Sequence, residues 1–404
     1  MAPDLVERVR RRLADEPWPP SPARIAAAAR AEGLLATSAE ALPLLERLSD
    51  EVAGAGPLGP LLRDPSVTDV LVNAPDEVWV DRGGGLVREP SVSFASDADV
   101  VALVRRLAAR VGRRLDAAQP WVDARLPEGT RLHAVLAPPA TRATCVSIRT
   151  LRRQHLGLED LRTSGALDAC LAEWLAAIVA ARLAVVVSGG TGTGKTTLLG
   201  CLLGLVAPAE RVVIVEDAAE LRPAAPHVVS LEARPPNVEG AGAVTLRDLV
   251  RQAMRMRPDR LVVGEVRGGE VVDMLAALNT GHDGGMTTIH ANAAADVLPR
   301  LAALAGPAGL VGEALRAQVW AALDVCVHLT RTGARRRVAE VSLVGHGTAL
   351  AYDGAVTTAG PAAAALAALV ASRGVPPPPM PTPSAPPALP TPSAPPAPPA
   401  GAAP

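Results

Sequence analysis

The chain contains a single lysine, and this lysine lies in a short glycine-rich segment. Lysine and arginine together number 40 in 404 residues, so the other 39 cations are arginines. The lysine is Lys195, and the segment over residues 189–196 reads GGTGTGKT. Lysine carries a compact ammonium on a thin stem, whereas arginine carries a broad planar guanidinium. A loop wrapped tightly around phosphate has room for the first and little room for the second, so the position of the one lysine predicts a nucleoside triphosphate site.

The segment matches the pattern G-x-x-x-x-G-K-[ST] of phosphate-binding loops. In such loops backbone N–H groups converge on the phosphates, the lysine reaches between the β- and γ-phosphates, and the hydroxyl holds Mg²⁺. An apolar run over residues 183–188 predicts a buried parallel strand before the loop, and residues 196–203 favour a helix after it. These flanks disfavour a glycine-rich turn that contains a lysine by chance. The predicted binding residues are Gly189, Gly190, Thr191, Gly192, Thr193, Gly194, Lys195, Thr196 and Thr197.

Composition limits the other classes of function. The formal net charge is -1, which does not imply a broad polyanion-binding surface, although local arginine clusters remain open. The sequence has no run of about 18 apolar residues, so no membrane span is predicted. The amino terminus lacks the apolar core of a signal peptide. The four cysteines include no C-x-x-C pair, which indicates reduced structural cysteines in a cytosolic protein without a zinc site.

The pattern of strands and helices predicts two folded domains and a tail. Residues 375–404 contain 15 prolines in 30 residues, and the segment PTPSAPPA occurs twice, so we predict a disordered tail of polyproline-II type. The alternation of strands and helices in the second domain is typical of a parallel α/β core. The predicted parts are a helical segment (1–55), a smaller mixed α/β domain (56–150), a linker (151–167), an α/β nucleotide-binding domain (168–346), a weakly structured extension (347–374) and the tail (375–404).

Two acidic clusters follow apolar strands downstream of the loop. VVIVEDAAE over residues 212–220 contains Glu216 and Glu220, and LVVGEVR over residues 261–267 contains Glu265. Parallel strands end at the same edge of a sheet, so these carboxylates are predicted to lie near the nucleotide. A single acid after a strand is commonly a helix cap or a surface residue. Two such clusters favour hydrolysis, which needs carboxylates for Mg²⁺ and for the attacking water.

Two histidines lie in the segment GHDGGMTTIHAN over residues 281–292. His282 and His290 are eight residues apart across a Gly-Gly turn, a spacing that does not suit a helical metal site. A sensor of the γ-phosphate or a structural histidine fits this position better.

The order of these motifs resembles one known family. GGTGTGKTT, VIVEDAAEL, RMRPDRLVVGEVRG and NTGHDGGMTTIHAN are similar to the Walker A, Asp box, Walker B and His box of the type II and type IV secretion ATPases. The stretches LLRDPSVTDVLVNAPDEVWVD and EGTRLHAVLAPPA point to the Tad (Flp pilus) assembly branch, also called the CpaF group. The resemblance covers about residues 45–345. The tetracysteine zinc module of many pilus-extension relatives is absent, and the tail lies outside the family pattern.

The resemblance implies a homo-hexameric ring of two-domain subunits with a RecA-like P-loop NTPase core, which binds ATP and Mg²⁺. It implies that Glu265 is the Walker B carboxylate and a magnesium ligand with Thr196, and that Glu216 or Glu220 orients the water. His290 would sense the γ-phosphate. Arginines of the first domain close on the nucleotide in this family, and the matching positions are Arg131 and Arg149, with Arg267 as a further candidate. Which of the three glutamates activates water stays open.

Three functions follow as hypotheses. The first is a motor at the cytoplasmic face of the membrane, held there by an integral membrane platform protein, which powers pilin assembly or export. The second is a conjugation ATPase that assists DNA transfer, although neutral charge and scarce aromatic residues disfavour direct nucleic-acid binding. The third is a nucleotide-gated scaffold without turnover, which the retained glutamates disfavour.

Overall fold

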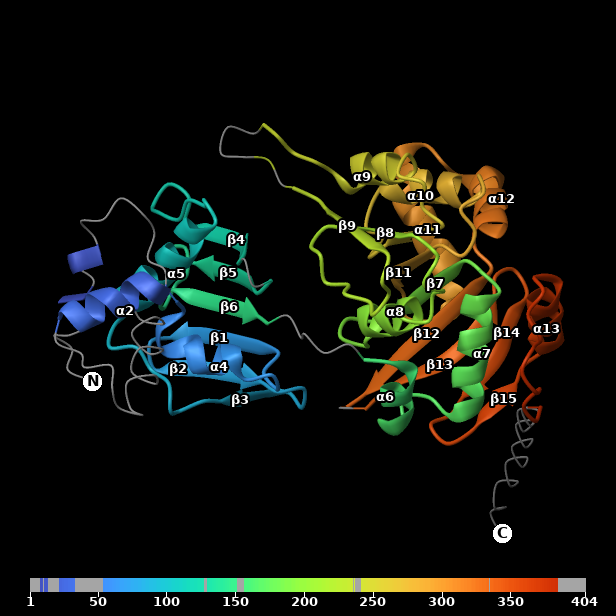
Figure 1. Cartoon of the computed structure of the whole chain (residues 1–404), viewed down its shortest axis with the longest axis horizontal. Helices are drawn as coiled ribbons and strands as arrows, with labels where there is room; N and C mark the ends of the chain where they lie inside the picture. The colour runs from blue at the N-terminus through green and yellow to red at the C-terminus, as the bar shows by residue number, and fades with distance from the viewer. Residues whose placement is uncertain are drawn as a thin grey trace, which may run out of the picture. The chain divides into compact units, whose positions relative to one another are not determined.

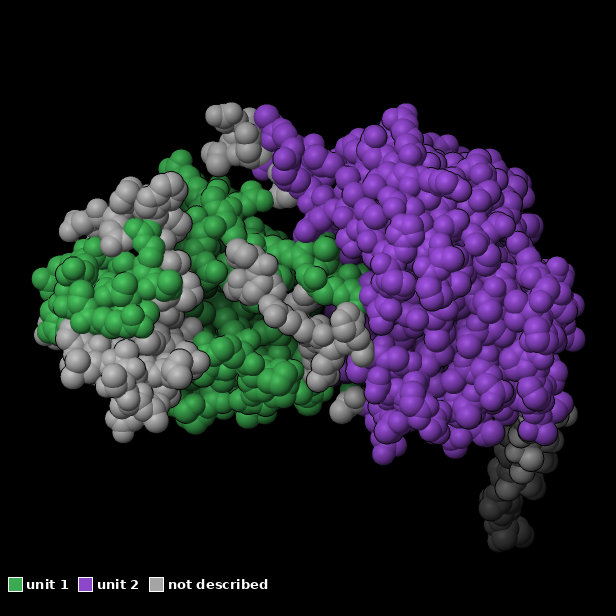
Figure 2. Space-filling model, viewed as in Figure 1, with its two compact units in different colours: residues 1–155, 218–222, 332–334 green, residues 156–217, 223–331, 335–404 purple. Residues whose placement is uncertain are grey.

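The computed structural model describes residues 8–9, 11–13, 22–32, 54–126, 129–150, 156–234, 236, 241–333 and 335–383. The chain divides into two compact units, which Figure 2 shows in green and purple. Unit 1 contains residues 1–155 together with the short later segments 218–222 and 332–334. Unit 2 contains the rest of residues 156–404.

Unit 1 is built on a six-stranded sheet in which every neighbouring pair of strands is antiparallel. Helix α5 (Asp97–Arg110) buries an apolar stripe that includes Val100 and Leu107 in the core of this unit, and the Ser96 hydroxyl caps its first turn. In sheet order the strands are β3 (Leu86–Arg88), β2 (Glu77–Asp81), β1 (Asp69–Ala74), β6 (Cys145–Arg149), β5 (Arg131–Val135) and β4 (Trp121–Arg125). The other helices described here are α2 (Pro22–Ala31), η1 (Gly56–Leu58) and α4 (Gly59–Arg63).

Unit 2 contains a nine-stranded sheet with a parallel centre (Figure 1). Its central strands are fully buried runs such as VVVSG and VVIVE, because helices cover both faces of a parallel sheet. Six neighbouring strands of this sheet pair in parallel: β12, β7, β11, β10, β8 and β9. The strands β13, β14 and β15 pair antiparallel. The order is β15 (Thr357–Ala359), β14 (Gly347–Tyr352), β13 (Arg335–Leu343), β12 (Val325–Thr332), β7 (Val185–Gly189), β11 (Met286–His290), β10 (Arg260–Val263), β8 (Val212–Glu216) and β9 (Val228–Glu232).

Helices pack on this sheet in two groups. One group packs its apolar side chains against Val186, Val213, Val263 and Ile289 in a single core, and Figure 1 shows these helices gathered together. It consists of α9 (Leu246–Ala253), α10 (Glu270–Leu278), α11 (Val297–Ala305) and α12 (Gly312–Ala322). The short 3-10 helices η2 (Ala294–Asp296) and η3 (Gly306–Ala308) lie on either side of α11 in the chain. The remaining helices are α6 (Leu158–Thr163), α7 (Ala169–Ala180), α8 (Lys195–Leu203) and α13 (Ala363–Ser372). The predicted α/β class with a parallel core is thus confirmed for unit 2.

The prediction of weak structure over residues 347–374 was wrong. This stretch contains β14, β15 and α13, and it completes the sheet of unit 2. Its sequence is rich in alanine and has little periodicity, so the order comes from packing: Leu350, Leu366 and Val370 are fully buried. Helix α6 likewise lies inside the predicted linker, of which residues 151–155 are outside the described part of the chain.

The first nine residues of the proline-rich segment are held against unit 2. The indole Nε1 of the fully buried Trp174 donates to the Pro379 carbonyl at 3.3 Å. The amide of Ala359 in β15 donates to the Thr382 carbonyl at 2.9 Å. The prediction of disorder is therefore wrong for residues 375–383, because the carbonyls of Pro379 and Thr382 accept hydrogen bonds from α7 and β15. Residues 384–404, and most of the predicted helical segment 1–55, lie outside the described residues.

Among the described residues, no single helix is long and apolar enough to cross a membrane. One bent pair of helices, Ala294–Ala308 with Gly312–Ala322, passes the same test of length and composition.

A buried ion pair fastens the start of β10 to the neighbouring segments of unit 2. Arg260 is 1% exposed, and its Nε and NH2 donate to Glu210 at 2.8 and 3.1 Å. The same NH2 donates to the Val179 carbonyl at 2.8 Å, and Arg182 also pairs with Glu210, at 2.9 Å. Burial raises the pKa of Glu210, but the hydrogen bond and charge of Arg260 outweigh it and hold that pKa below its ordinary value.

We expect Arg260→Met to lower the free energy of unfolding by about 3 kcal/mol in urea denaturation, because it leaves a buried carboxylate without its main partner. Glu210 has a lowered pKa when folded, so its stabilising contribution is present above about pH 4.3 and is lost as the pH falls through the lowered value. The variant should therefore unfold at a higher pH on acidification than the wild type. The exposed Arg255→Met is the control and should change stability by less than about 0.5 kcal/mol. Equal stability of both variants would contradict this account.

Candidate active site

The phosphate-binding loop connects β7 to α8, as its sequence predicts. Gly194 precedes the helix in the left-handed region at φ 97°, a conformation that glycine adopts without strain. Gly189 ends β7 where the neighbouring strand β12 comes close: a Cβ on this residue would lie 2.7 Å from the Leu329 carbonyl oxygen. Thr193 closes the loop by donating its hydroxyl to the Gly190 carbonyl at 2.9 Å. Thr196 is half-buried in the first turn of α8, while Thr191 and Thr197 are exposed.

Lys195 is folded into this loop and is 7% exposed. Its Nζ donates to the carbonyls of Gly189 and Gly190 at 3.1 and 3.0 Å, and lies 3.3 Å from Nδ1 of His290. Burial lowers the pKa of the ammonium, and the charge of Glu265 acts in the opposite direction. The side chain is thus placed beside the loop backbone where phosphate oxygens would approach it.

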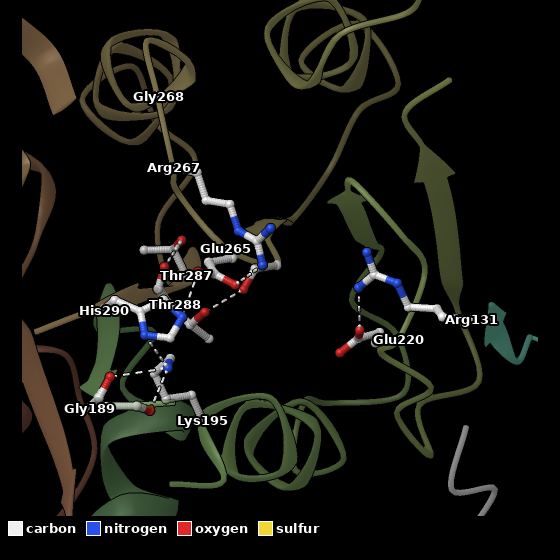
Figure 3. Close-up of polar contacts among 12 residues, drawn as sticks. Arg131, Gly189, Lys195, Glu220, Glu265, Arg267, Gly268, Thr287, Thr288 and His290 are labelled. Carbon is white, nitrogen blue, oxygen red and sulfur yellow. Dashed lines mark hydrogen bonds and ion pairs between the residues drawn. The ribbon is translucent and has the colours of Figure 1, made fainter. Parts of the chain in front are cut away.

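A chain of polar contacts runs from Lys195 to the end of β10 (Figure 3). His290 Nε2 lies 3.0 Å from Glu265 Oε1, and Arg267 NH2 donates to Glu265 Oε2 at 2.7 Å. Burial lowers the pKa of His290, and the charge of Lys195 lowers it further. A neutral imidazole can accept from the Lys195 ammonium at Nδ1 and donate to the carboxylate at Nε2, so all four side chains fit one protonation state.

The strand order of the sheet brings these residues together. β11 lies between β7 and β10, and His290 at its end is directly opposite Gly189. The Thr288 hydroxyl donates to the Gly264 carbonyl at 2.7 Å, which ties β11 to the residue before Glu265. Residues about 70 and 95 positions beyond the lysine therefore converge on the loop, as expected for the carboxyl edge of a parallel sheet.

The predicted glutamates of the first acidic cluster are separated. Glu216 ends β8, is 5% exposed, and packs against the end of β10: a Cβ on Gly264 would lie 2.6 Å from its Cγ. Glu220 belongs to unit 1, where Arg131 NH1 donates to it at 3.3 Å (Figure 3). Arg149 also lies in unit 1 and pairs with Asp69 at 2.9 Å. The side chains linked to Lys195 in the contact chain are therefore those of His290, Glu265 and Arg267. The other three predicted residues, Glu220, Arg131 and Arg149, belong to unit 1.

Two contacts were missed by sequence reasoning. Arg336 donates from Nε to the Gly192 carbonyl at 2.8 Å, and a Cβ on Gly192 would lie 3.2 Å from Arg331 NH1. Nothing distinguishes these two among 39 arginines in the sequence, since their role depends on which strand lies beside the loop. His282 in turn contacts its own helix end through Nδ1 and the Ala277 carbonyl at 3.0 Å, a structural role.

The side chains present fit a magnesium ion that arrives with phosphate. The Thr196 hydroxyl and the Glu265 carboxylate offer the oxygen ligands that Mg²⁺ prefers. Among the residues described, no group of three or more His, Cys, Asp or Glu side chains could hold a metal ion. Mg²⁺ is commonly bound by one or two protein oxygens together with substrate phosphates, and this donor set agrees with that.

Comparisons with known proteins agree with the fold. The family described as "Type II/IV secretion system protein" matches residues 51–354. The chain belongs to this family. The predicted superfamily, with its RecA-like core, is thereby confirmed, while the narrower Tad branch stays a prediction.

Relatives and one solved structure extend the comparison. A putative conjugal transfer protein of Mycobacterium tuberculosis is 55% identical over 312 residues, which cover 76% of this chain and 88% of that protein. The conjugal transfer protein TrbB of Rhizobium radiobacter is 34% identical over 284 residues, which cover 69% of this chain and 84% of that protein. The pilus retraction motor PilT with bound ADP has a TM-score of 0.50 at 17% identity, covering 74% of this chain and 80% of that one. This last likeness shows the fold alone.

Proposed function

We propose that this protein hydrolyses ATP and works as a ring-shaped motor for a secretion or pilus machine. The proposal rests on the chain of contacts Lys195–His290–Glu265–Arg267, which starts at the lysine of the phosphate-binding loop. A loop and lysine alone would give binding. Hydrolysis also requires a carboxylate near the phosphates, and here an imidazole and a guanidinium hold one beside the lysine.

The residues divide the work as follows. Lys195 exchanges the carbonyls of Gly189 and Gly190 for β- and γ-phosphate oxygens, and its ammonium counters the charge that develops on the transferring group. Water attacks the γ-phosphorus, the bond to the bridging oxygen of ADP breaks, and Glu265 takes the proton of the water. His290 is neutral and hydrogen-bonded to both Lys195 and Glu265. It therefore senses whether the γ-phosphate has displaced Lys195 from its position beside the imidazole. Mg²⁺, held by Thr196 and Glu265 in part through water, would neutralise phosphate charge.

Glu216 has a different proposed duty. It is buried at the end of β8 against Gly264, so it supports the backbone that presents Glu265. Arg131 and Arg149 lie on unit 1, and we propose that they supply guanidinium charge to the phosphates when that unit closes on the nucleotide, with Glu220 holding Arg131 until then.

The proposed assembly is a homo-hexamer docked on an integral membrane protein at the cytoplasmic face. Support comes from the family membership and from relatives named for conjugal transfer, with the fold that is shared with a pilus motor. Direct DNA binding is a weaker candidate, because the two exposed arginines of α9, Arg247 and Arg251, both pair with Asp273, at 2.6 and 2.8 Å. If the protein serves conjugation, we therefore propose that it does so by driving protein transport and not by binding DNA itself.

Removal of the divalent cation tests the reaction. We expect phosphate release from ATP to fall to background in excess chelator and to return when Mg²⁺ is added, because the triphosphate charge is then again neutralised. The control is the melting temperature without nucleotide, which chelation should leave unchanged. Turnover that persists in chelator would contradict the assigned magnesium ligands.

A further inference from the structure

The hairpin formed by β12 and β13 extends past the end of β7, where the phosphate-binding loop begins. β12 pairs with β7 in parallel, and Leu329 lies opposite Gly189, the first residue of the loop. β12 then continues to Thr332, past the point where β7 has ended, and β13 starts at Arg335. Arg331 at the end of unit 2's part of β12 and Arg336 in β13 both lie beside the loop.

Alternate residues of β13 point in different directions. Arg336 donates from Nε to the Gly192 carbonyl at 2.8 Å, and its Cδ lies 3.7 Å from the position that a Cβ on Gly194 would take. Arg337, next in sequence, instead donates to the Asp353 carbonyl and to the Thr330 hydroxyl. Side chains of a strand alternate between its two faces, so Arg336 is the member of this arginine run that faces the loop.

The bond from Arg336 fixes one peptide unit of the loop. In a trans peptide the C=O and the following N–H point in opposite directions. Because Arg336 draws the Gly192 carbonyl toward the hairpin, the N–H of Thr193 is turned to the other side. Lys195 holds the carbonyls of Gly189 and Gly190 at the other end of the loop. The two cations therefore bond carbonyls at both ends of the loop, and the bond from Arg336 leaves Lys195 free to exchange its own carbonyl partners for phosphate oxygens.

We propose that Arg336 is a positioning residue for nucleotide binding: it holds the Gly192–Thr193 peptide so that the Thr193 N–H faces the triphosphate. Arg331, whose NH1 would lie 3.2 Å from a Cβ on Gly192, adds a second guanidinium at the same place. The inference rests on the proposed function, since it concerns the same triphosphate. It adds a contribution from β13, a strand that no loop motif includes. Preorganisation of this kind strengthens binding because the loop loses less freedom when the ligand binds.

The test is Arg336→Ala, with affinity measured by titration of a fluorescent ATP analogue. We expect the dissociation constant to rise about tenfold, the change that corresponds to loss of one hydrogen bond to a charged group. KM for ATP should rise with it, whereas kcat at saturating ATP should change less than about twofold. Arg336→Lys should recover most of the affinity, because an ammonium can still donate to the Gly192 carbonyl.

Arg335→Ala is the matched control. It removes the same charge from the same hairpin, at an exposed residue, and should leave the affinity within about twofold of wild type. The melting temperature without nucleotide should be the same for all variants. Normal affinity in Arg336→Ala, or an equal loss in Arg335→Ala, would overturn this inference and leave the proposed function intact. A wild-type protein that binds no nucleotide would overturn both.

Discussion

Lys195→Ala abolishes ATP hydrolysis in our account, with a loss of at least about 100- to 1000-fold in turnover. The reason is that no other lysine exists in the chain, and the ammonium is already buried in the loop with its hydrogen bonds directed at the carbonyls of Gly189 and Gly190. Truncation to alanine removes the only ammonium that can reach between the phosphates. The measurement is phosphate release at saturating ATP and Mg²⁺, compared with wild type at equal protein concentration.

Two controls separate chemistry from folding in this variant. The melting temperature without nucleotide should stay close to that of wild type, because the lysine bonds only to loop carbonyls and to His290. A substitution of the exposed Arg335 by alanine, outside the loop, should leave turnover within about twofold of wild type. Hydrolysis that survives in Lys195→Ala would show that the triphosphate binds elsewhere.

We expect Glu265→Gln to retain bound ATP and to lose turnover. The amide cannot take the proton of the attacking water, so we expect kcat to fall about 100- to 10,000-fold. Binding should persist, because Lys195 and the loop are unchanged and the amide oxygen can still contact His290 or Arg267. Rapid separation of protein from free nucleotide, followed by chromatography of what remains bound, should find ATP on the variant and ADP on the wild type.

The comparison with Glu216→Gln decides between the candidate bases. Glu216 is 5% exposed and packs on Gly264, so in our account its amide variant keeps most of the turnover and loses stability instead. The opposite pattern, full activity in Glu265→Gln and none in Glu216→Gln, would move the base to the end of β8.

Much of the site follows from the sequence because its parts are local. The loop, its strand and its helix lie in one stretch of about 20 residues, and each has a recognisable pattern. Placement of Glu265 and His290 beside Lys195 required only the rule that parallel strands end at a common edge, and their contacts in the structure agree with it.

The rest depends on contacts between distant residues, which a single sequence does not show. The five residues from Glu216 to Glu220 look like one acidic cluster, yet the first is buried in unit 2 and the last pairs with Arg131 in unit 1. Arg336 is indistinguishable from its arginine neighbours until β13 is known to lie beside the loop. The order of residues 347–383 was also missed, because alanine and proline acquire it from the buried surface they cover and from donors such as Trp174.

Hydrolysis measured together with molar mass tests the central proposal most directly. Wild-type protein would be resolved by size with light scattering, and each fraction assayed for phosphate release with ATP and Mg²⁺. We expect turnover to elute with a species six times the mass of the 41.4 kDa chain and to be absent from the same species of Lys195→Ala. Full turnover in the monomer, or a hexamer of wild type that binds ATP without hydrolysing it, would contradict a ring motor.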